Sequence, residues 1–574
     1  MKILLTAVNA KYIHSNLAVY SLRAYAEESA EHIELAEFTI NQKTESILQE
    51  IYKRKPEVLC FSCYIWNISI VEELAEEFHK LRPEVPIWVG GPEVSYEAEV
   101  FLEKHPYIKG VMMGEGEKIF SNLCRYYLGR QTKSDASGRF SVGDEEEMSL
   151  NRIPGIAYRT FAGIRVHAPE TVLDMSDIPF AYQKMEDFEH KIIYYESSRG
   201  CPFRCSYCLS SVDKKLRFRD MELVKRELEF FIEHEVLQVK FVDRTFNCDS
   251  AHALEIWRFI KEKDKGITNF HFEVAADLMT EEELDFIAAL RPGLIQLEIG
   301  VQTTNPATIE EIHRRMDLDK VKQVVRRIQS GKNIHQHLDL IAGLPFEDYQ
   351  TFGKSFDEIY ALKPEQLQLG FLKVLKGSYM YGHQEEYEIV HTSRPPYEVL
   401  QTKWLAYEDV QGIKRGEEML EVYYNSGQYQ KSIRLLEEVF DSAFHMFREL
   451  GEYYERKGYF LLNHTRNRRM EILLEFAEEI FAADKAERIR EAAVYDIYAR
   501  ENAKTRPVFA ENLQEWKQLS RRYCKKGKLS HLERFWYEDD GKKREKPYYI
   551  LFDYQDRSPL DHQAIATKIE ETEE

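Results

Sequence analysis

Two stretches of this 574-residue chain alternate short apolar runs, rich in β-branched residues, with segments of helical periodicity. In the first stretch the runs are Ile3–Val8, Ile33–Ile40, Val58–Tyr64, Ile87–Gly90 and Ile108–Met113. Strands that alternate with helices predict a parallel sheet covered on both faces. The chain therefore begins with a Rossmann-like α/β domain, whose ligands are expected outside the carboxyl ends of the strands.

The second stretch shows the same alternation at a longer period. We expect its strands at Ile192–Ser197, Val239–Asp243, Phe270–Ala275, Ile295–Val301, His337–Ile341 and Leu367–Val374. Six such units predict a partial (β/α)6 barrel of the TIM type. In barrels of this kind the chemistry takes place at the carboxyl ends of the strands.

Composition and periodicity divide the chain into four parts. They are 1–130, the Rossmann-like domain; 131–187, a linker with a β-hairpin; 188–385, the barrel; and 395–574, a mainly helical carboxyl-terminal domain. Helical spacing in the last part predicts one continuous apolar face through Ile433, Leu436, Phe440, Ala443 and Phe447.

The charge balance limits the classes of partner. A net charge of −20 argues against a uniformly basic surface for nucleic acid. The local excess of Lys and Arg at 517–546 favours a solvated face over a tRNA site. The sequence has no signal-peptide core and no run of 18 apolar residues, so we expect a cytoplasmic protein without a membrane partner.

Three of the eight cysteines crowd into one short segment directly after the first barrel strand. Cys201, Cys205 and Cys208 have the spacing C-x3-C-x2-C. Three thiolates on one tight loop can hold three irons of a [4Fe–4S] cube and leave the fourth iron open, whereas electron-transfer clusters take four cysteines. A structural zinc site would need a fourth ligand, and Cys248 comes only 40 residues later. The spacing therefore predicts a catalytic iron–sulfur cluster.

This segment resembles the radical S-adenosylmethionine (radical SAM) enzymes, whose motif is C-x3-C-x-aromatic-C, with Tyr207 as the aromatic residue. The likeness implies that SAM chelates the open iron and that one electron from the cluster cleaves SAM to a 5′-deoxyadenosyl radical. It also implies an external one-electron reductant of the flavodoxin or ferredoxin type. The SAM contacts that it implies are Tyr207, Asp243, Thr245, Glu273, Gln302, Arg314 and Asp339.

Segments at the ends of three predicted barrel strands are compared with the family's SAM-binding segments. Two of them resemble the family, and one departs from it. Glu298–Gln302 resembles the family's Glu-x-Gly-x-Gln segment, and Asp339–Pro345 resembles its fifth-strand segment. Val242–Phe246 stands where the family usually has a glycine pair for the SAM amino group. Both glycines are replaced, which leaves the roles of the Asp243 and Thr245 side chains open.

Glycine-rich turns follow the fourth and fifth strands of the amino-terminal sheet, at Gly90–Ser95 and Gly114–Glu117. Glycines there let the backbone approach a large flat ligand. Together with Phe61–Asn67, these turns resemble the cobalamin-binding domain that precedes many radical SAM cores. The cobalamin contacts that the likeness implies are Ser62, Tyr64, Gly90, Gly91, Pro92, Glu93, Ser95, Gly114, Glu115 and Gly116.

The Asp-x-His-x-x-Gly motif of cobalamin domains is absent, so the likeness implies base-off binding without a histidine from that motif. His14 is the nearest alternative ligand, although a solvated or core histidine is the simpler interpretation. Cys60 and Cys63 are an odd number of positions apart on one strand, which places their side chains on opposite faces and argues against a second cluster. Apolar packing accounts for Cys60 and Cys124.

We therefore expect a cobalamin-dependent radical SAM enzyme that methylates an unactivated carbon of an unknown substrate. A related enzyme could use the same cofactors for rearrangement or ring closure. A tRNA methylthiotransferase would need three suitable amino-terminal cysteines and a small β-rich terminal domain. A non-catalytic corrinoid carrier or sensor would have no use for an open cluster. The carboxyl-terminal part resembles an uncharacterised domain that follows such cores, and it contains no catalytic motif.

Overall fold

The computed structural model describes most of the chain, and the described residues are 1–134, 150–169, 172–212, 215–481, 483–512, 514, 517–524 and 529–569. They form two compact units. The first unit is Met1–Glu283, Ile312–Arg315 and Leu372–Leu400, and the second is Leu284–Glu311, Met316–Phe371 and Gln401–Glu574. Among the described helices, none has the length and apolar composition needed to cross a membrane.

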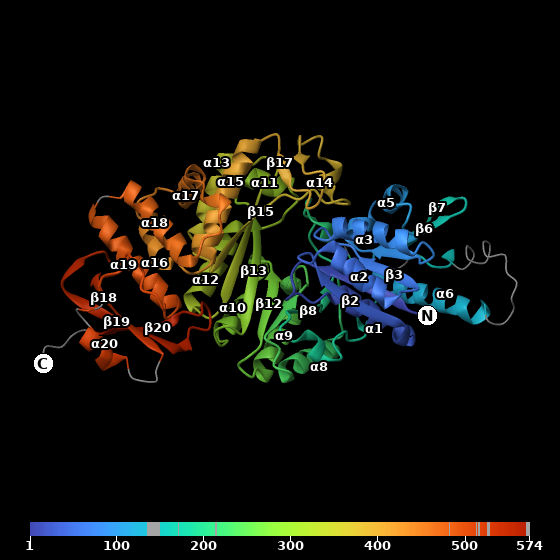
Figure 1. Ribbon diagram of the computed structural model, residues 1–574, viewed down its shortest axis with the longest axis horizontal. Helices are drawn as coiled ribbons and strands as arrows, with labels where there is room; N and C mark the ends of the chain where they lie inside the picture. Colours follow the sequence, from blue (N-terminus) through green and yellow to red (C-terminus); the bar gives the residue numbers. More distant parts are fainter. Residues whose placement is uncertain are drawn as a thin grey trace. The chain divides into compact units, whose positions relative to one another are not determined.

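A seven-stranded sheet forms the amino-terminal part of the first unit, with strand order β2-β1-β3-β4-β5-β6-β7 (Figure 1). Its strands are β1 (Ile3–Asn9), β2 (Ile33–Thr39), β3 (Val58–Ser62), β4 (Ile87–Gly90), β5 (Gly110–Met112), β6 (Ile156–Thr160) and β7 (Gly163–Val166). The first five pair in parallel, with Ile3 opposite both Ile33 and Val58, and β6 and β7 extend the sheet as an antiparallel hairpin. The predicted Rossmann-like fold is confirmed.

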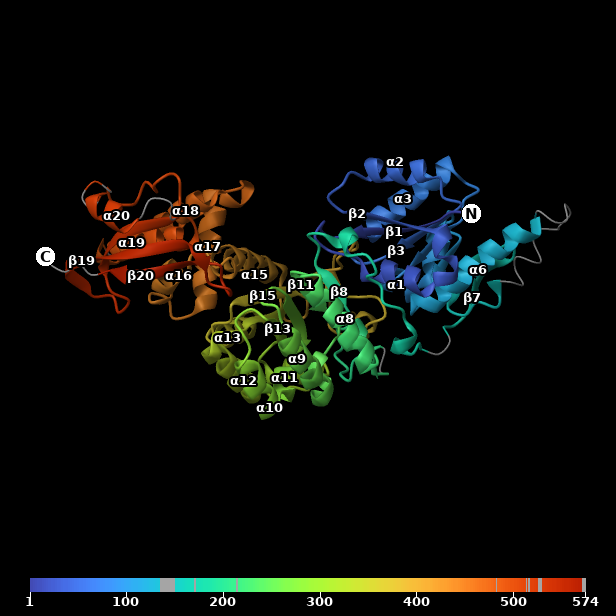
Figure 2. The same ribbon diagram turned by 90° about the horizontal axis from the view of Figure 1, so that it is seen from below.

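Helices cover both faces of this sheet. They are α1 (Leu17–Tyr25), α2 (Thr44–Arg54), α3 (Ile68–Leu81), α4 (Pro92–Ser95), α5 (Ala98–Lys104) and α6 (Gly116–Ser134). Figure 2 shows α2 and α3 on one side of the sheet and α1 and α6 on the other. Because strand side chains alternate between faces, Cys63 lies in one core, whereas Cys60 and Cys124 lie in the other. Cys60 and Cys63 therefore face opposite sides, as their odd separation predicts.

The predicted linker is described only in part. Helix α6 continues to Ser134, past the expected domain end at residue 130. Residues 135–149 of the linker and the last residues, 570–574, lie outside the described part of the chain. Further along, two short 3₁₀ turns at Met175–Asp177 and Met185–Phe188 precede the barrel region.

The first unit also holds three parallel strands of the barrel region, β8 (Ile193–Tyr195), β11 (Gln238–Phe241) and β12 (Asn269–Val274). Val239 on β11 lies opposite Ile193 on β8 and Phe270 on β12. Helices α8 (Met221–Glu233) and α9 (Ser250–Lys263) begin at aspartate side chains, Asp220 and Asp249, that accept hydrogen bonds from first-turn backbone N–H groups. A two-stranded ribbon, β9 (Ser198–Arg199) with β10 (Arg217–Phe218), flanks the cysteine segment.

The second unit holds three further parallel strands, β13 (Ile295–Gln302), β14 (His335–Ala342) and β15 (Gln366–Phe371). His337 on β14 lies opposite Glu298 on β13 and Gln366 on β15. The helices of this region are α10 (Glu281–Ala288), α11 (Pro306–Glu311), α12 (Leu318–Gly331) and α13 (Tyr349–Tyr360). All six predicted barrel strands are therefore present, each paired in parallel.

Helices dominate the carboxyl-terminal part, as predicted. They are α15 (Tyr407–Leu420), α16 (Gln430–Glu437), α17 (Ala443–Lys457), α18 (Arg466–Ile480), α19 (Ala483–Arg500) and α20 (Lys517–Tyr523). Shorter elements precede them, namely α14 (Tyr379–Gly382), β16 (Val390–His391) and β17 (Val399–Gln401). The continuous helix face expected from Ile433 to Phe447 is wrong, because α16 ends and α17 begins between these residues. The break has a local cause, since the Ser442 side chain accepts a hydrogen bond from the His445 backbone N–H and starts α17.

A three-stranded antiparallel sheet closes the described chain, where the sequence analysis expected helices. It consists of β18 (Ser530–Tyr537), β19 (Lys543–Arg557) and β20 (Ala564–Ile569), with β19 in the centre. Every second residue from Tyr548 to Tyr554 enters one core together with Phe535 and Tyr498. This period of two is typical of a strand, and the dense charges around it obscured it in the sequence.

Asp496 fixes the start of α16 and provides a stability test. Its buried carboxylate accepts hydrogen bonds from Lys431 N at 3.0 Å, Ser432 N at 2.9 Å and Ser432 Oγ at 2.8 Å. Replacement by asparagine puts an amide N–H against these donors. We expect Asp496→Asn to lower the free energy of unfolding of this region by about 1–3 kcal/mol, measured by urea titration with tryptophan fluorescence.

The same substitution changes the pH dependence of stability. Burial raises the pKa of Asp496 from 3.8 to about 6, so the folded state favours the protonated carboxyl. Its contribution to the unfolding free energy is full below pH 3.8 and is lost as the pH rises through about 6. Asp496→Asn is expected to remove this dependence, whereas Asp539→Asn, at an exposed carboxylate paired with Lys431, should keep it. An unchanged slope in Asp496→Asn would contradict the assignment.

Candidate functional site

The cysteine loop is held by the backbone on both sides. It follows β9 through Gly200, whose φ of +92° suits glycine, and a Cβ there would lie 2.6 Å from the carbonyl oxygen of Lys215. Within the loop, Ser206 N donates to Ile312 O at 2.9 Å, and Met380 N donates to Ser206 O at 2.9 Å. These hydrogen bonds hold the loop at Ser206, in the middle of the segment that carries Cys201, Cys205 and Cys208.

The three loop thiols form a donor set suited to an iron–sulfur cluster. None of the three forms a disulfide, Cys201 and Cys205 are buried, and Cys208 is half-buried. Burial raises the pKa of the Cys201 thiol. This donor set fits a cluster that takes three thiolates from one loop.

Three of the predicted SAM residues lie against this loop. Arg314 Nη1 donates to Cys205 Sγ at 3.7 Å and to Tyr207 Oη at 3.4 Å. Thr245 Oγ1 lies 3.7 Å from Cys201 Sγ. The structure therefore brings a guanidinium, a phenol and a hydroxyl around the thiols, which is the kind of surrounding that a zwitterionic ligand such as SAM requires.

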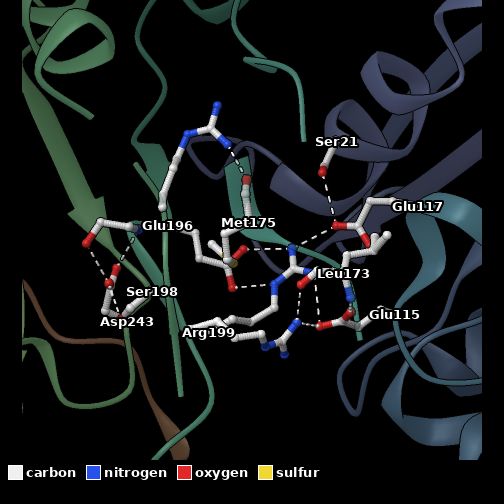
Figure 3. A network of polar contacts seen from close by, with 12 residues as sticks. Ser21, Glu115, Glu117, Leu173, Met175, Glu196, Ser198, Arg199 and Asp243 are labelled. Atoms are coloured by element: carbon white, nitrogen blue, oxygen red, sulfur yellow. Dashed lines mark hydrogen bonds and ion pairs between the residues drawn. The ribbon is translucent and has the colours of Figure 1, made fainter. Parts of the chain in front are cut away.

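The side chain of Asp243 is engaged with other residues of the protein, and its contact with SAM stays a prediction. Its carboxylate is fully buried and accepts hydrogen bonds from Ser197 N at 3.0 Å, Ser197 Oγ at 2.7 Å and Ser198 Oγ at 2.6 Å (Figure 3). Ser198 begins β9. Asp243 thus ties the end of β11 to the strand that leads into the cysteine loop.

The other predicted SAM residues lie near the carboxyl ends of their strands. Glu273 is next to the last residue of β12, and Gln302 ends β13 at a register shift with a φ of +74°. The Gln302 Oε1 atom is buried and makes no hydrogen bond to the described residues. An unsatisfied buried acceptor is costly unless a ligand satisfies it, so Gln302 fits a ligand contact.

Asp339 has a neighbour that the sequence analysis missed. Its Oδ1 lies 3.2 Å from Nε2 of His337, and the ligand atoms of Glu298, His337 and Asp339 all lie within 4.8 Å of one another. The signal was in the sequence, because residues two apart on a strand share a face. His337 and Asp339 thus form a polar group on one face of β14.

The turn after β4 forms a cradle of the shape predicted for cobalamin. Gly91 has a φ of +118°, and a Cβ there would lie 2.4 Å from the carbonyl oxygen of Cys63, so only glycine fits. Ser95 Oγ donates to Gly91 O at 2.8 Å and closes the turn, in which Pro92 begins α4. At the end of β3, Ser62 Oγ is buried without a hydrogen-bond partner among the described residues. A close backbone approach and an unsatisfied hydroxyl fit a large ligand.

Two predicted cobalamin residues are engaged with other side chains. The buried Glu93 accepts a hydrogen bond from Tyr397 Oη at 2.9 Å, and burial raises the pKa of Glu93. The ring of Tyr64 stacks on Trp66 at 4.4 Å between centroids. Glu93 therefore shapes the turn through Tyr397, whereas the Tyr64–Trp66 pair presents a flat apolar surface.

The turn after β5 carries Gly114, Glu115 and Gly116, and it faces the strand that precedes the cysteines. Glu115 and the neighbouring Glu117 both contact Arg199 of β9 (Figure 3). Burial opposes the charge of Glu117, yet the Arg199 guanidinium holds the pKa of Glu117 below its ordinary value. Arg199 was missed by the sequence analysis, which considered only the cysteine motif that it precedes.

A cavity of about 490 Å³ lies in the first unit, and Glu117 and Arg199 are among the residues that line it. It is lined by the Tyr64–Trp66 pair, by the segment 175–182 and by residues at the ends of β8 and β11. His14 also lines it and forms a hydrogen bond from Nδ1 to Tyr194 Oη. This bond engages His14 with the protein and favours the simpler of the two interpretations of this residue.

Comparison with known families assigns the two halves of this site. The family model "B12 binding domain" matches residues 3–124, and the model "Radical SAM superfamily" matches residues 195–359. A third model, "Protein of unknown function (DUF4080)", matches residues 385–559. A [4Fe–4S] cluster, SAM and cobalamin are the cofactors of the first two domains.

Curated relatives match over about half of the chain. The cobalamin-dependent radical SAM methyltransferase TokK of Streptomyces tokunonensis is 26% identical over 52% of this chain, which spans 44% of that protein. The hopanoid C-3 methylase of Methylococcus capsulatus is 23% identical over 48% of this chain and 50% of its own length. The chain thus spans about half the length of these curated relatives.

Solved structures share the fold at low identity. The radical SAM methyltransferase TsrM of Kitasatospora setae, with cobalamin and a [4Fe–4S] cluster bound, aligns with a TM-score of 0.52 at 18% identity, covering 68% of this chain and 76% of that chain. The cobalamin-dependent SAM radical enzyme OxsB aligns with a TM-score of 0.56 at 14% identity, over 86% of this chain and 78% of that chain. The chain therefore carries a B12 binding domain followed by a radical SAM domain.

Proposed function

We propose that the protein is a cobalamin-dependent radical SAM methyltransferase that methylates an unactivated carbon. The proposal is carried by three thiols outside any disulfide, Cys201, Cys205 and Cys208, on one loop that backbone hydrogen bonds hold at Ser206. When bound, the cluster supplies the electron that cleaves SAM, and cobalamin supplies the methyl group. TokK, TsrM and the hopanoid methylase are named as methyltransferases or methylases, which supports this choice of reaction.

The residues around the loop have separate tasks in this proposal. Arg314 binds the SAM carboxylate, because it is the cation that contacts the cysteine loop at both Cys205 and Tyr207. Tyr207 would contact the adenine of SAM, and Thr245, which lies beside Cys201, would border the cluster. The remaining SAM contacts are assigned to Glu273, Gln302 and Asp339.

The amino-terminal domain binds the corrin ring with backbone rather than with a metal-ligating histidine. The turns Gly90–Ser95 and Gly114–Gly116 would hold the ring, and the hydroxyl of Ser62, which has no partner among the described residues, would donate to it. Tyr64 would contribute a flat surface at the edge of the cavity. The absence of an Asp-x-His-x-x-Gly motif supports base-off binding without a protein histidine.

Ring closure with the same cofactors is the second candidate function. It is favoured by the relative named anaerobic magnesium-protoporphyrin IX monomethyl ester cyclase from Rubrivivax gelatinosus, which is 21% identical over 54% of this chain and 55% of its own length. The methylthiotransferase alternative needs amino-terminal cysteines that share one cluster. Cys60 and Cys63 lie in separate cores on opposite sides of the sheet, which argues against it.

The proposal includes a cytoplasmic location and a flavodoxin or ferredoxin as reductant. All eight cysteines are free thiols, which suits a reducing compartment. Neither nucleic acid nor a membrane is among the proposed partners. The substrate is an unidentified molecule with an unactivated C–H bond.

Anaerobic reconstitution with iron, sulfide and hydroxocobalamin tests the proposed function. We expect about four irons and about one corrinoid per chain, and formation of 5′-deoxyadenosine from SAM after reduction. Transfer of a deuterated methyl group from labelled SAM to a product would distinguish methylation from ring closure. Iron near eight per chain would favour a methylthiotransferase, and corrinoid binding without SAM cleavage would favour a carrier.

The proposed role of Arg314 predicts a specific loss of SAM affinity. Arg314→Gln removes the cation while keeping a hydrogen-bonding side chain, so we expect SAM to bind about tenfold more weakly or worse. Equilibrium dialysis of SAM against the reconstituted protein measures this. Arg315→Gln is the matched control, because Arg315 is the exposed neighbour of Arg314. Equal affinities for the two variants would remove Arg314 from the SAM site.

A further inference from the structure

One arginine joins the two proposed cofactor sites. Arg199 is the last residue of β9 and stands two positions before Cys201. Its Nη2 lies 2.7 Å from Glu117 Oε1, and its Nη1 lies 3.4 Å from Glu115 Oε1 (Figure 3). These glutamates flank Gly116 in the turn assigned to the corrin ring. A single side chain therefore reaches from the start of the cysteine loop to the corrin turn.

A second arginine reinforces this connection. Arg217 lies opposite Arg199 in the β9–β10 ribbon, and its Nη1 lies 2.7 Å from Glu115 Oε1. The same Nη1 donates to Leu173 O at 2.9 Å, and Leu173 N donates to Glu115 Oε2 at 2.9 Å. Glu115 is therefore held by two strands of the ribbon and by the segment before the barrel.

Arg199 itself is bound by a third carboxylate. Glu196 accepts hydrogen bonds from Arg199 Nε at 2.9 Å and from Nη2 at 2.8 Å. Glu117 also accepts a hydrogen bond from Ser21 Oγ on α1 at 3.2 Å. The side chains of Arg199 and Glu117 are only 19% and 7% exposed, so water competes weakly for these contacts. A planar guanidinium bound by carboxylates at several edges fixes their relative positions.

We propose that Arg199 is a positioning residue that couples corrinoid binding to cluster binding. The inference rests on the proposed function. A bound cluster orders the loop that begins at Cys201, and Arg199 passes this order to Glu115 and Glu117 in the corrin turn. The corrinoid therefore binds more tightly to the cluster-loaded protein, and by linkage it stabilises the cluster in return.

The test compares corrinoid affinity with and without the cluster in the full chain. Hydroxocobalamin is titrated anaerobically into cluster-free and reconstituted protein, and binding is followed by visible absorption. We expect the reconstituted wild-type protein to bind about fivefold more tightly or better. In Arg199→Gln and in Glu117→Gln this ratio should fall close to one. Glu117→Gln leaves the residues next to the cysteines intact, and iron content is measured for every variant.

Arg219→Gln is the matched control. Arg219 is also a buried arginine beside the barrel, and its Nη2 lies 2.6 Å from Glu227 Oε1, but it donates to Glu227 and to the carbonyl oxygen of Met175 rather than to Glu115 or Glu117. It should keep the wild-type ratio. A wild-type ratio near one, a preserved ratio in Arg199→Gln and Glu117→Gln, or an equal loss in Arg219→Gln would overturn the coupling. Wild-type protein that binds no corrinoid in either form would refute the proposed function as well.

Discussion

A chain in which Cys201, Cys205 and Cys208 are all alanine is expected to hold no cluster and to form no 5′-deoxyadenosine from SAM. The three thiols are the donors on the loop, and alanine offers no ligand atom for iron. Iron content should fall from about four per chain to the background of the preparation. SAM cleavage should fall below detection, because no electron reaches SAM without the cluster. Iron analysis and chromatography of the reaction products measure the two effects.

Cys524→Ala provides the control for this prediction. Cys524 is a free, half-buried thiol at the end of α20, outside the cysteine loop. Its replacement should leave both iron content and SAM cleavage unchanged. Cleavage of SAM by the triple alanine variant would contradict the assignment of Cys201, Cys205 and Cys208 as cluster ligands, even if the protein retained some iron elsewhere.

The parallel strands could be predicted closely because their sequences carry the signal locally. Strand β4 occupies Ile87–Gly90, as expected, since an apolar β-branched run meets a glycine pair there. Strands β1 and β2 differ from expectation by one residue at their ends. A strand buried on both faces is a continuous apolar run, and its end is marked by the turn chemistry that follows.

The terminal sheet could not be predicted in the same way. Its central strand, β19, buries Tyr548, Ile550, Phe552 and Tyr554 in one core, but charged residues stand at both of its ends. Its partner β18 comes from the segment rich in Lys and Arg. The charge run suggested a solvated helix. The segment forms strands because it packs against Tyr498 and Val494 of α19. This contact joins residues far apart in the sequence.

Residues of the candidate site could be predicted from the sequence where a motif identifies them. They could be predicted less well where only contacts between distant segments identify them. Tyr207, Thr245 and Arg314 lie at the cysteine loop, in keeping with the positions that the likeness implies. Asp243 accepts hydrogen bonds from Ser197, which follows β8, and from Ser198, which begins β9, and no local sequence pattern indicates these partners. Arg199 was overlooked for a similar reason, since Glu115 and Glu117 follow a strand of another sheet.

Gly91→Ala, in the turn after β4, is expected to weaken corrinoid binding strongly. The φ of Gly91 is +118°, which strains any side-chain-bearing residue, and the new Cβ would lie 2.4 Å from the Cys63 carbonyl oxygen. Strain of this kind costs about 1–3 kcal/mol, and relief requires the turn to move away from the end of β3. We expect hydroxocobalamin to bind at least about tenfold more weakly, measured by visible absorption titration.

Gly266→Ala separates this effect from a general loss of stability. Gly266 also has a positive φ, of +81°, but a Cβ there meets no atom within 4 Å. The two variants therefore share the backbone strain, and only Gly91→Ala adds a clash in the proposed corrin cradle. Far-ultraviolet circular dichroism should show both proteins folded. If Gly91→Ala bound the corrinoid as tightly as Gly266→Ala, the close approach of this turn to the corrin ring would be wrong, because displacement of the cradle must weaken whatever the cradle holds.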